Sequence, residues 1–253
     1  IGALQGTVSD ETLQENATTL AKEWFNKALN NGLAMFQGNL RNIYIDEGDF
    51  DNARRVALTA AELGNPTMML YTGLDCHEHG KFEDAFTWFT KGAALGQAES
   101  TAELADYYYH FYDTKELRRL IPYNPVKAIG LYRRAATKHF SDAGYAALQA
   151  AFGYIFHIGH LPLDWGLIAD LTHMAATKER FMFSLPYIGY MRIHGLGVTK
   201  NIRFGVQSLT RVLDEEKRAL EEEDRVLFYD ITRALTRVAL GYAYEKGYVT
   251  GKP

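Results

Sequence analysis

The feature that most constrains the fold of this chain is a short pattern of residues that returns along it. The clearest copy spans residues 188–205, where an Ile-Gly pair is followed by Arg192, Gly195, Gly197 and Asn201 at fixed spacing. Shorter or degenerate copies lie at 40–48, 104–108 and 240–247. A recurring helical unit predicts a solenoid, in which each unit packs on its neighbours. Solenoids usually present a surface that holds other molecules, so the pattern favours binding over catalysis.

The second helix of the unit shows how the copies are spaced. Ala21, Ala53 and Ala85 begin equivalent stretches that lie 32 residues apart. The next equivalent stretch begins at Ala128, 43 residues further on, so an inserted connection lies between the two. We place this connection at 113–124. Because two prolines lie at its end, we expect it to be a stiff loop or a short turn.

Glycines mark the ends of the expected helices. Gly32, Gly64 and Gly96 follow the alanine-rich stretches, where glycine supplies the left-handed conformation that ends a helix without strain. No stretch shows the alternation typical of a strand. We therefore predict an all-α fold, a right-handed α-solenoid of about five to six helix pairs that forms one domain over 1–253. The expected helices span 11–30, 34–47, 51–63, 67–79, 83–95, 98–112, 125–138, 143–158, 163–177, 183–194, 202–222 and 225–246.

These residues resemble the Sel1-like repeat family, a relative of the tetratricopeptide repeats. The copy at 188–205 follows the family pattern Leu-Gly-x-x-Tyr-x-x-Gly-x-Gly-Val-x-x-Asn/Asp-x-x-x-Ala, with Ile188, Arg192 and Gly205 as substitutions. The resemblance covers most of residues 20–250. It implies a solenoid of Sel1-like or TPR-like helix pairs that binds another protein and catalyses nothing.

The resemblance implies several roles within the family. The resemblance is weakest at 140–180, so the number and register of the repeats stay open in that segment. Members act as bacterial adaptors, periplasmic regulators, parts of envelope and exopolysaccharide machinery, or immunity proteins paired with secreted toxic effectors. An array of this size implies most directly a protein that binds and inhibits a partner protein, such as a secreted effector or toxin. The alternative is a scaffold or adaptor of cell-envelope machinery, and a hydrolase is a remote third reading.

Composition narrows the partners and the compartment. The formal net charge of −4 gives no basic footprint for nucleic acid. No apolar run reaches the roughly 18–20 residues that span a bilayer. The single cysteine, Cys76, excludes an intrachain disulfide and a cysteine-based zinc site. Because the chain begins at Ile1, we expect a processed or trimmed form. We expect the periplasm as its location, with the cytoplasm left open.

Sequence motifs for catalysis are scarce. Residues 157–160 read His-Ile-Gly-His, a motif of class I aminoacyl-tRNA synthetases, but without a nucleotide-binding sheet pattern around it we interpret it as a helix end. Cys76, His77 and His79 could ligate zinc, yet on a helix they point in different directions, so we expect Cys76 to be a buried thiol. No nucleophile elbow, phosphate-binding loop or His-Glu-x-x-His sequence occurs. We therefore expect no enzyme, no cofactor and no metal site.

The partner-binding surface is expected on the first helix of each pair, which lines the concave face in solenoids of this kind. The outward positions are Asn42, Asp46, Asp75, Glu78, Asp106, Tyr107, His110, Tyr190, His194, Tyr242 and Lys246. Their four carboxylates are expected to form one acidic track that attracts a basic partner. Tyr107 belongs to a dense aromatic cluster, which indicates either packing in the core or an anchor for the partner.

The C-terminal part of the chain predicts a covered helix. Tyr242, Tyr244 and Tyr248 belong to a unit whose second helix is missing from the sequence. Because the ends of a solenoid need capping, we expect these rings to be covered by the preceding acidic helix, by self-association or by the partner.

Overall fold

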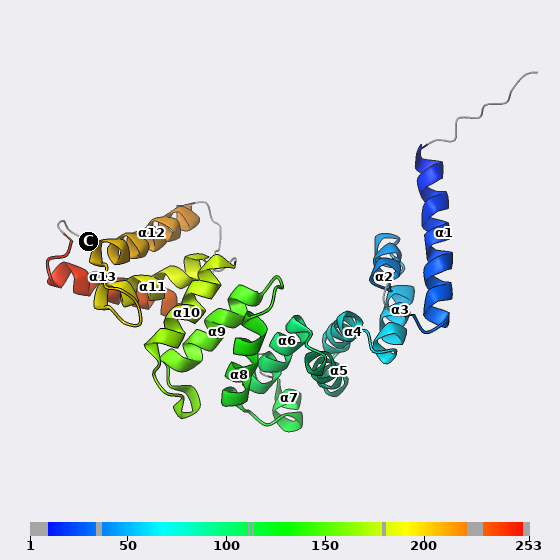
Figure 1. Cartoon of the computed structure of the whole chain (residues 1–253), viewed down its shortest axis with the longest axis horizontal. Coiled ribbons are helices and arrows are strands. Elements are labelled where there is room, and N and C mark those ends of the chain that lie inside the picture. The colour runs from blue at the N-terminus through cyan, green and yellow to red at the C-terminus, as the bar shows by residue number, and fades with distance from the viewer. Residues whose placement is uncertain are drawn as a thin grey trace, which may run out of the picture. The chain divides into compact units, whose positions relative to one another are not determined.

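The architecture is helical throughout the part of the chain that the structure describes. A computed structural model describes residues 10–33, 37–110, 112, 114–178, 181–221 and 230–249, and every regular element within them is a helix (Figure 1). Helices α2 to α4 each pack on the next one along the chain, and so do α8 to α12. Neighbour-on-neighbour packing is how a solenoid is built, so the predicted all-α class is confirmed.

The chain divides into two compact units, which are described separately. Unit 1 comprises residues 1–104 and 114–120, and unit 2 comprises 105–113 and 121–253. Unit 1 contains α1 (Asp10–Asn30), α2 (Gln37–Asp46), α3 (Phe50–Glu62), α4 (Pro66–Glu78), α5 (Phe82–Ala94), the first part of α6 (Ala98–Tyr109) and α7 (Lys115–Leu120). Unit 2 contains the rest of α6, α8 (Pro125–Ala136), α9 (Ala143–Ile155), a short 3-10 helix η1 (Ile158–His160), α10 (Trp165–Thr177), α11 (Phe181–His194), α12 (Ile202–Glu221) and α13 (Asp230–Glu245).

Local sequence explains where the helices begin and end. At the start of α4 the Asn65 side chain accepts hydrogen bonds from the backbone N–H groups of Thr67 and Met68, and Pro66 occupies the first turn. Such a cap satisfies donors that no helix can satisfy internally. The preceding helix α3 ends at Gly64, whose φ of +93° is the left-handed conformation expected there. The predicted glycine stops are confirmed.

Small residues let the helices within each unit approach closely. A Cβ added to Gly73 of α4 would lie 2.6 Å from the Phe89 ring of α5. In unit 2 a Cβ added to Gly205 of α12 would lie 2.8 Å from the backbone oxygen of Gly189 in α11. Neither position has room for a side chain, so the small residues of the repeat are there for packing.

The inserted connection is more ordered than expected. Instead of a loop, residues 115–120 form the helix α7. The Thr114 hydroxyl caps it by accepting a hydrogen bond from the Leu117 backbone N–H at 3.1 Å. The Leu117 side chain is fully buried, so burial of one apolar residue stabilises a helix too short to form by itself.

Candidate protein-binding surfaces

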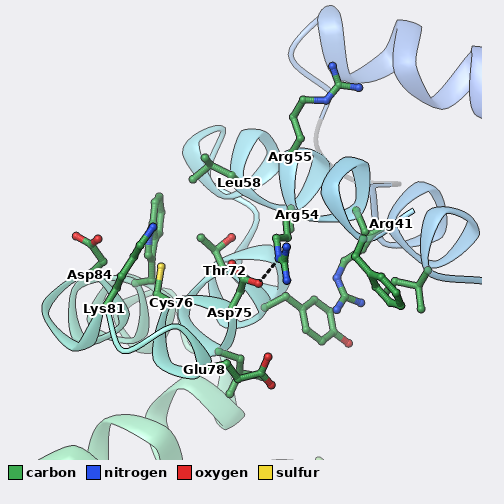
Figure 2. Close-up of a pocket in the computed structure, with 17 residues that line it drawn as sticks. Arg41, Arg54, Arg55, Leu58, Thr72, Asp75, Cys76, Glu78, Lys81 and Asp84 are labelled. Atoms are coloured by element: carbon green, nitrogen blue, oxygen red, sulfur yellow. Dashed lines mark hydrogen bonds and ion pairs between the residues drawn. The ribbon is translucent and has the colours of Figure 1, made fainter. Parts of the chain in front are cut away.

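A groove lies within unit 1, lined by side chains of α2, α3, α4 and α5. Its volume is about 800 Å³, and its wall combines charged residues with aromatic and aliphatic ones. Figure 2 shows the Arg54 and Asp75 side chains meeting at the centre, with Arg41 on one side and Lys81, Cys76 and Asp84 on the other. The groove lies between consecutive helix pairs, where the interface between neighbouring repeats reaches the surface.

An ion pair crosses the centre of the groove. The Arg54 Nε lies 2.6 Å from Asp75 Oδ1, and the hydrogen bond to Asp75 is the main reason why the pKa of Arg54 is raised. Arg54 also approaches Asp51, one turn earlier on α3, at 3.4 Å. Both members of the central pair are half-exposed, so a ligand can reach them. An exposed pair of this kind adds little to the stability of the fold.

Aromatic and aliphatic side chains form the rim of the groove. Phe50 is 57% exposed, and Leu58 is also exposed although it is large and apolar. Both lie on the same face of α3 as Arg54, because residues four apart on a helix are neighbours. Across the groove Trp88 of α5 is half-buried, and the Arg41 guanidinium lies 3.8 Å from the centre of the Tyr71 ring. This rim resembles the aromatic and arginine anchors that dominate protein interfaces.

Thr72 and Cys76 also line the groove from α4. Thr72 is only 7% exposed, and its hydroxyl has no hydrogen-bond partner in the described part of the chain. Cys76 was expected to be buried, but it is half-buried and faces the groove. The expectation is wrong because Cys76 lies on the side of α4 that lines the groove. Burial raises the pKa of the Cys76 thiol, so it is held as the neutral thiol.

The predicted acidic residues of unit 1 do not form an uninterrupted acidic track. Asp75 and Glu78 line the groove, but Arg54 neutralises Asp75, and cationic side chains share the wall. Asn42 and Asp46 are exposed on α2 but are not part of the groove lining. The sequence expectation missed the cations because Arg54 and its partner lie 21 residues apart, on different helices.

Two residues predicted to face a partner are instead buried in unit 2. Tyr107 has 0% of its surface exposed and Asp106 has 7%. The Asp106 carboxylate accepts hydrogen bonds from the hydroxyls of Tyr132, in α8, and Tyr145, in α9, the latter at 3.2 Å. The expected outward position of Tyr107 and Asp106 is therefore wrong, because α8 and α9 cover that face of α6. For Tyr107 the structure supports the other alternative, packing in the core.

The tyrosine hydroxyls around Asp106 are held in their neutral form. Burial raises the pKa of Tyr132 far above its usual value, and the negative charge of Asp106 raises it further. The same two causes, in the same order, raise the pKa of Tyr145. A neutral hydroxyl can donate a hydrogen bond to a carboxylate, so the cluster is stable as long as both tyrosines keep their protons.

His110, at the end of α6, is held by the segment between α7 and α8. Its Nε2 lies 2.8 Å from the backbone oxygen of Ile121, and its ring lies 5.3 Å from the Tyr123 ring, centre to centre. The Tyr108 backbone oxygen in turn accepts a hydrogen bond from the Asn124 N–H at 2.9 Å. These contacts leave His110 half-buried at the edge of α6 rather than free on the surface.

The four remaining predicted residues come together in unit 2. The His194 ring lies between the rings of Tyr190 and Tyr242, with centre-to-centre distances of 4.5 and 4.6 Å. The Lys246 Nζ lies 5.7 Å from the centre of the Tyr242 ring. Burial lowers the pKa of His194, and the positive charge of Lys200 lowers it further. The middle ring is therefore neutral at pH 7. We call Tyr190, His194 and Tyr242 the ring row of unit 2.

The C-terminal helix is partly covered within the chain. Tyr242 and Tyr244 pack against a cluster that contains Ile193 of α11 and Leu209 of α12. In addition Glu216 of α12, which is buried, pairs with Arg233 and Arg237 of α13, each at 3.0 Å. The predicted cover by the preceding acidic helix is therefore found for Tyr242 and Tyr244. Tyr248 stays exposed.

The comparison with known proteins places the chain in a family. The Sel1 repeat family model matches residues 13–33, 57–97, 98–139, 187–207 and 232–253, which together make up more than half of the chain. The chain belongs to the Sel1 repeat family. Sel1 repeat proteins are generally protein-interaction modules and non-catalytic scaffolds. No curated protein matches this Sel1 repeat protein.

Two solved structures are similar to this Sel1 repeat protein. A Sel1 repeat protein from Oxalobacter formigenes matches with a TM-score of 0.57 and 20% sequence identity, over 69% of this chain and 69% of that one. The protective antigen c5321 of uropathogenic Escherichia coli, which displays an SLR fold, matches with a TM-score of 0.46 and 15% identity, over 92% of this chain and 60% of that one. At these identities the first likeness supports the fold alone.

The described residues carry neither a candidate membrane span nor a clustered metal site. None of their helices has the length and apolar character needed to cross a membrane. Nor do they contain a group of three or more His, Cys, Asp or Glu side chains placed to hold a metal ion.

Proposed function

We propose that this Sel1 repeat protein binds a partner protein through the groove of unit 1 and inhibits it, as an immunity protein or a periplasmic regulator does. The observation that carries the proposal is the groove itself, in which an accessible ion pair is surrounded by exposed apolar side chains. Large apolar groups exposed together on a water-soluble surface are typical of an interaction site. The family supports protein binding in general, and inhibition and a periplasmic location are the specific parts of our proposal.

The size and chemistry of the groove suit a protein ligand. A volume of about 800 Å³ accommodates several side chains of a partner. The central ion pair can fix the orientation of a bound chain, while the rim supplies apolar contact. In protein interfaces such aromatic contacts give most of the affinity, and charges at the rim mainly change the association rate.

The ring row of unit 2 favours the alternative function, that of an adaptor in cell-envelope machinery. It is a second cluster of partly exposed aromatic side chains, in a different unit from the groove. An adaptor needs two surfaces because it joins two partners. An inhibitor needs one surface that covers the active part of a single partner.

The test begins with purification of partners from the native host, using the tagged full chain as bait and chemical crosslinking to locate the contact. We expect one dominant partner, crosslinked to α2–α5, whose activity falls when the full chain is added. Two partners that crosslink to different units, with the activity of each unchanged, would support the adaptor instead. A partner that binds equally well to the Phe50→Ala variant would show that the groove is not the site.

A matched control separates the groove from the general surface. Leu95 is, like Phe50, an exposed apolar residue of unit 1, but it does not line the groove. Phe50→Ala is expected to weaken the complex at least about tenfold, the loss typical of an anchor residue, and Leu95→Ala is expected to leave it unchanged. Because both side chains are exposed, neither change should disturb the fold.

A further inference from the structure

We propose that the groove of unit 1 takes a segment of the partner in which an acidic side chain is followed closely by a large apolar one. This inference rests on the proposed function and names the chemistry of the partner. It reverses the sequence-based expectation of a basic partner for unit 1. The observations behind it are the state of the charges in the groove and the position of its apolar rim.

The carboxylate that should have attracted a basic partner is already neutralised. Asp75 is paired with Arg54 at 2.6 Å, so a lysine of a partner would have to compete with that pair. The lining contains the cations Arg41, Arg54, Arg55 and Lys81, and the anions Asp75, Glu78 and Asp84, which leaves one positive charge in excess. The excess favours an anionic ligand.

Three of the four cations lie on one side of the groove. Figure 2 shows Arg41 and Arg54 on the side formed by α2 and α3, with Arg55 above them. In the same figure Asp84 lies beside Lys81 on the opposite side, and Glu78 lies below. The side formed by α2 and α3 is therefore the cationic one.

The Arg41 side chain is positioned to bind a carboxylate. Its guanidinium carbon lies 3.8 Å from the centre of the Tyr71 ring, a cation–π contact that restricts the position of the side chain. Its hydrogen bond to the Asn42 side chain, at 3.4 Å, is long, and it forms no ion pair with any described residue. A planar guanidinium with free N–H groups binds a carboxylate through two parallel hydrogen bonds. Arg41 is thus the groove residue best suited to receive an acidic side chain.

The apolar half of the ligand is positioned by α3 and α5. Phe50 and Leu58 are exposed on α3, and Trp88 contributes its ring from the other wall. Phe50 and Leu58 lie on the same helix as Arg54, so one short segment can contact both the cationic side and these apolar side chains. Burying an exposed aromatic or leucine side chain against a partner side chain is favourable by about 25 cal/mol for each Å² removed from water.

The wall of the groove also contains a buried hydroxyl without a described partner. Thr72 lines the groove, is more than nine-tenths buried, and has a hydroxyl without a hydrogen-bond partner in the described residues. Buried hydroxyls are almost always paired. The Thr72 hydroxyl is therefore an unsatisfied polar group of the wall itself, because its oxygen is closed to solvent and to a bound segment.

The test is selection of random dodecapeptides by phage display on the immobilised full chain. We expect the recovered peptides to be enriched in Asp or Glu next to Trp, Phe or Leu. The best of them, labelled with a fluorophore, is then titrated with the full chain by fluorescence polarisation. Arg41→Glu is expected to weaken binding at least tenfold, and Arg41→Lys to weaken it less, because lysine keeps the charge but not the two parallel hydrogen bonds.

A control variant separates this site from the net charge of the chain. Arg203 of unit 2 is exposed and does not line the groove, so Arg203→Glu makes the same change of net charge and should leave the affinity unchanged. Circular dichroism and the melting temperature show that each variant is folded. Affinity for the acidic peptide should also fall as salt concentration rises.

Other results would overturn the inference. They are enrichment of Lys- or Arg-rich peptides, recovery of no peptide, or equal affinity for Arg41→Glu and the unchanged chain. In each of these cases the native partner can still be recovered with the full chain and lost with Phe50→Ala, and the proposed protein-binding function then stands without the acidic ligand. If the native partner is also insensitive to Phe50→Ala, the proposed function fails as well.

Discussion

Helices α4 and α6 lie one 32-residue repeat apart, yet equivalent positions on them have opposite environments. Asp75 of α4 is half-exposed in the groove of unit 1, whereas Tyr107, 32 residues later, is completely buried in unit 2. One position earlier, Leu74 lines the groove, while its equivalent Asp106 is buried among tyrosines. The place of a residue within the repeat therefore does not decide whether it meets solvent.

The difference comes from the side chains that later helices place over each position. After α4 the chain turns at Gly80 directly into α5, and the groove stays open. After α6 comes the insertion, and residues 121–124 then fold back on the end of α6 before α8 begins. Tyr132 and Tyr145 complete the cover over Asp106. The buried state of Asp106 therefore comes from side chains of α8 and α9.

The largest expected effect contrasts the two equivalent residues directly. Tyr107→Ala should lower the free energy of unfolding by about 4 kcal/mol, because it leaves a cavity in a packed site. Asp75→Ala should cost less than about 1 kcal/mol, because it removes only an exposed ion pair. Urea unfolding followed by circular dichroism measures both. Equal losses for the two variants would contradict the assignment of Tyr107 to the core.

The next effect concerns the polar cluster that replaces the groove in unit 2. Asp106→Ala should lower the free energy of unfolding by about 3 kcal/mol, because the hydroxyls of Tyr132 and Tyr145 lose their acceptor while they stay buried. Asp106→Asn keeps an acceptor oxygen and should recover part of the loss. If both variants are as stable as the unchanged chain in thermal melting, the cluster has no structural role.

The same cluster should make the stability depend on alkaline pH. The pKa of Tyr132 is raised in the folded chain, mainly by burial, above the value of 10 that it has when exposed. Below pH 10 the tyrosine is protonated in both the folded and the unfolded chain, so the free energy of unfolding does not depend on its titration. Above pH 10 the free energy of unfolding falls by about 1.4 kcal/mol per pH unit for each such tyrosine. Tyr132→Phe should make this decline less steep. Urea titrations at pH 9, 10 and 11 test it, and identical slopes would argue against a buried neutral Tyr132.

The smallest expected effect compares two threonines, one from each unit. Thr172 of α10 is fully buried and its hydroxyl donates to the Ile168 backbone oxygen at 2.8 Å, whereas the Thr72 hydroxyl has no partner in the described residues. Thr72→Val should raise the free energy of unfolding by about 1 kcal/mol, since it removes an unsatisfied polar group and keeps the shape. Thr172→Val should lower it by about the same amount. A loss of stability for Thr72→Val would mean that its hydroxyl is satisfied after all, for instance by water.

Much of the candidate site was within reach of the sequence, and the rest was not. The helical positions that carry Tyr190, His194, Tyr242 and Lys246 come from counting along the repeat, and the structure brings these side chains together. Arg41, Arg54 and Phe50 were missed because the repeat pattern marks packing positions and not the surface between units. Their i, i+4 spacing with other groove residues, as in Phe50 and Arg54, was a signal that could have drawn attention to α3.

By itself the sequence determined the helical class, the position of most helices and the glycine stops, because these depend on residues close together in the chain. Propensity, capping and helical periodicity act over one or two turns, and they read the same in every unit. The tertiary structure alone decided which surface is open. Asp106 became a core acceptor because of Tyr132, 26 residues later, and Asp75 became half of an ion pair because of Arg54, 21 residues earlier. Burial and pairing depend on neighbours in space, and in this chain those neighbours come from other helices that the repeat pattern does not identify.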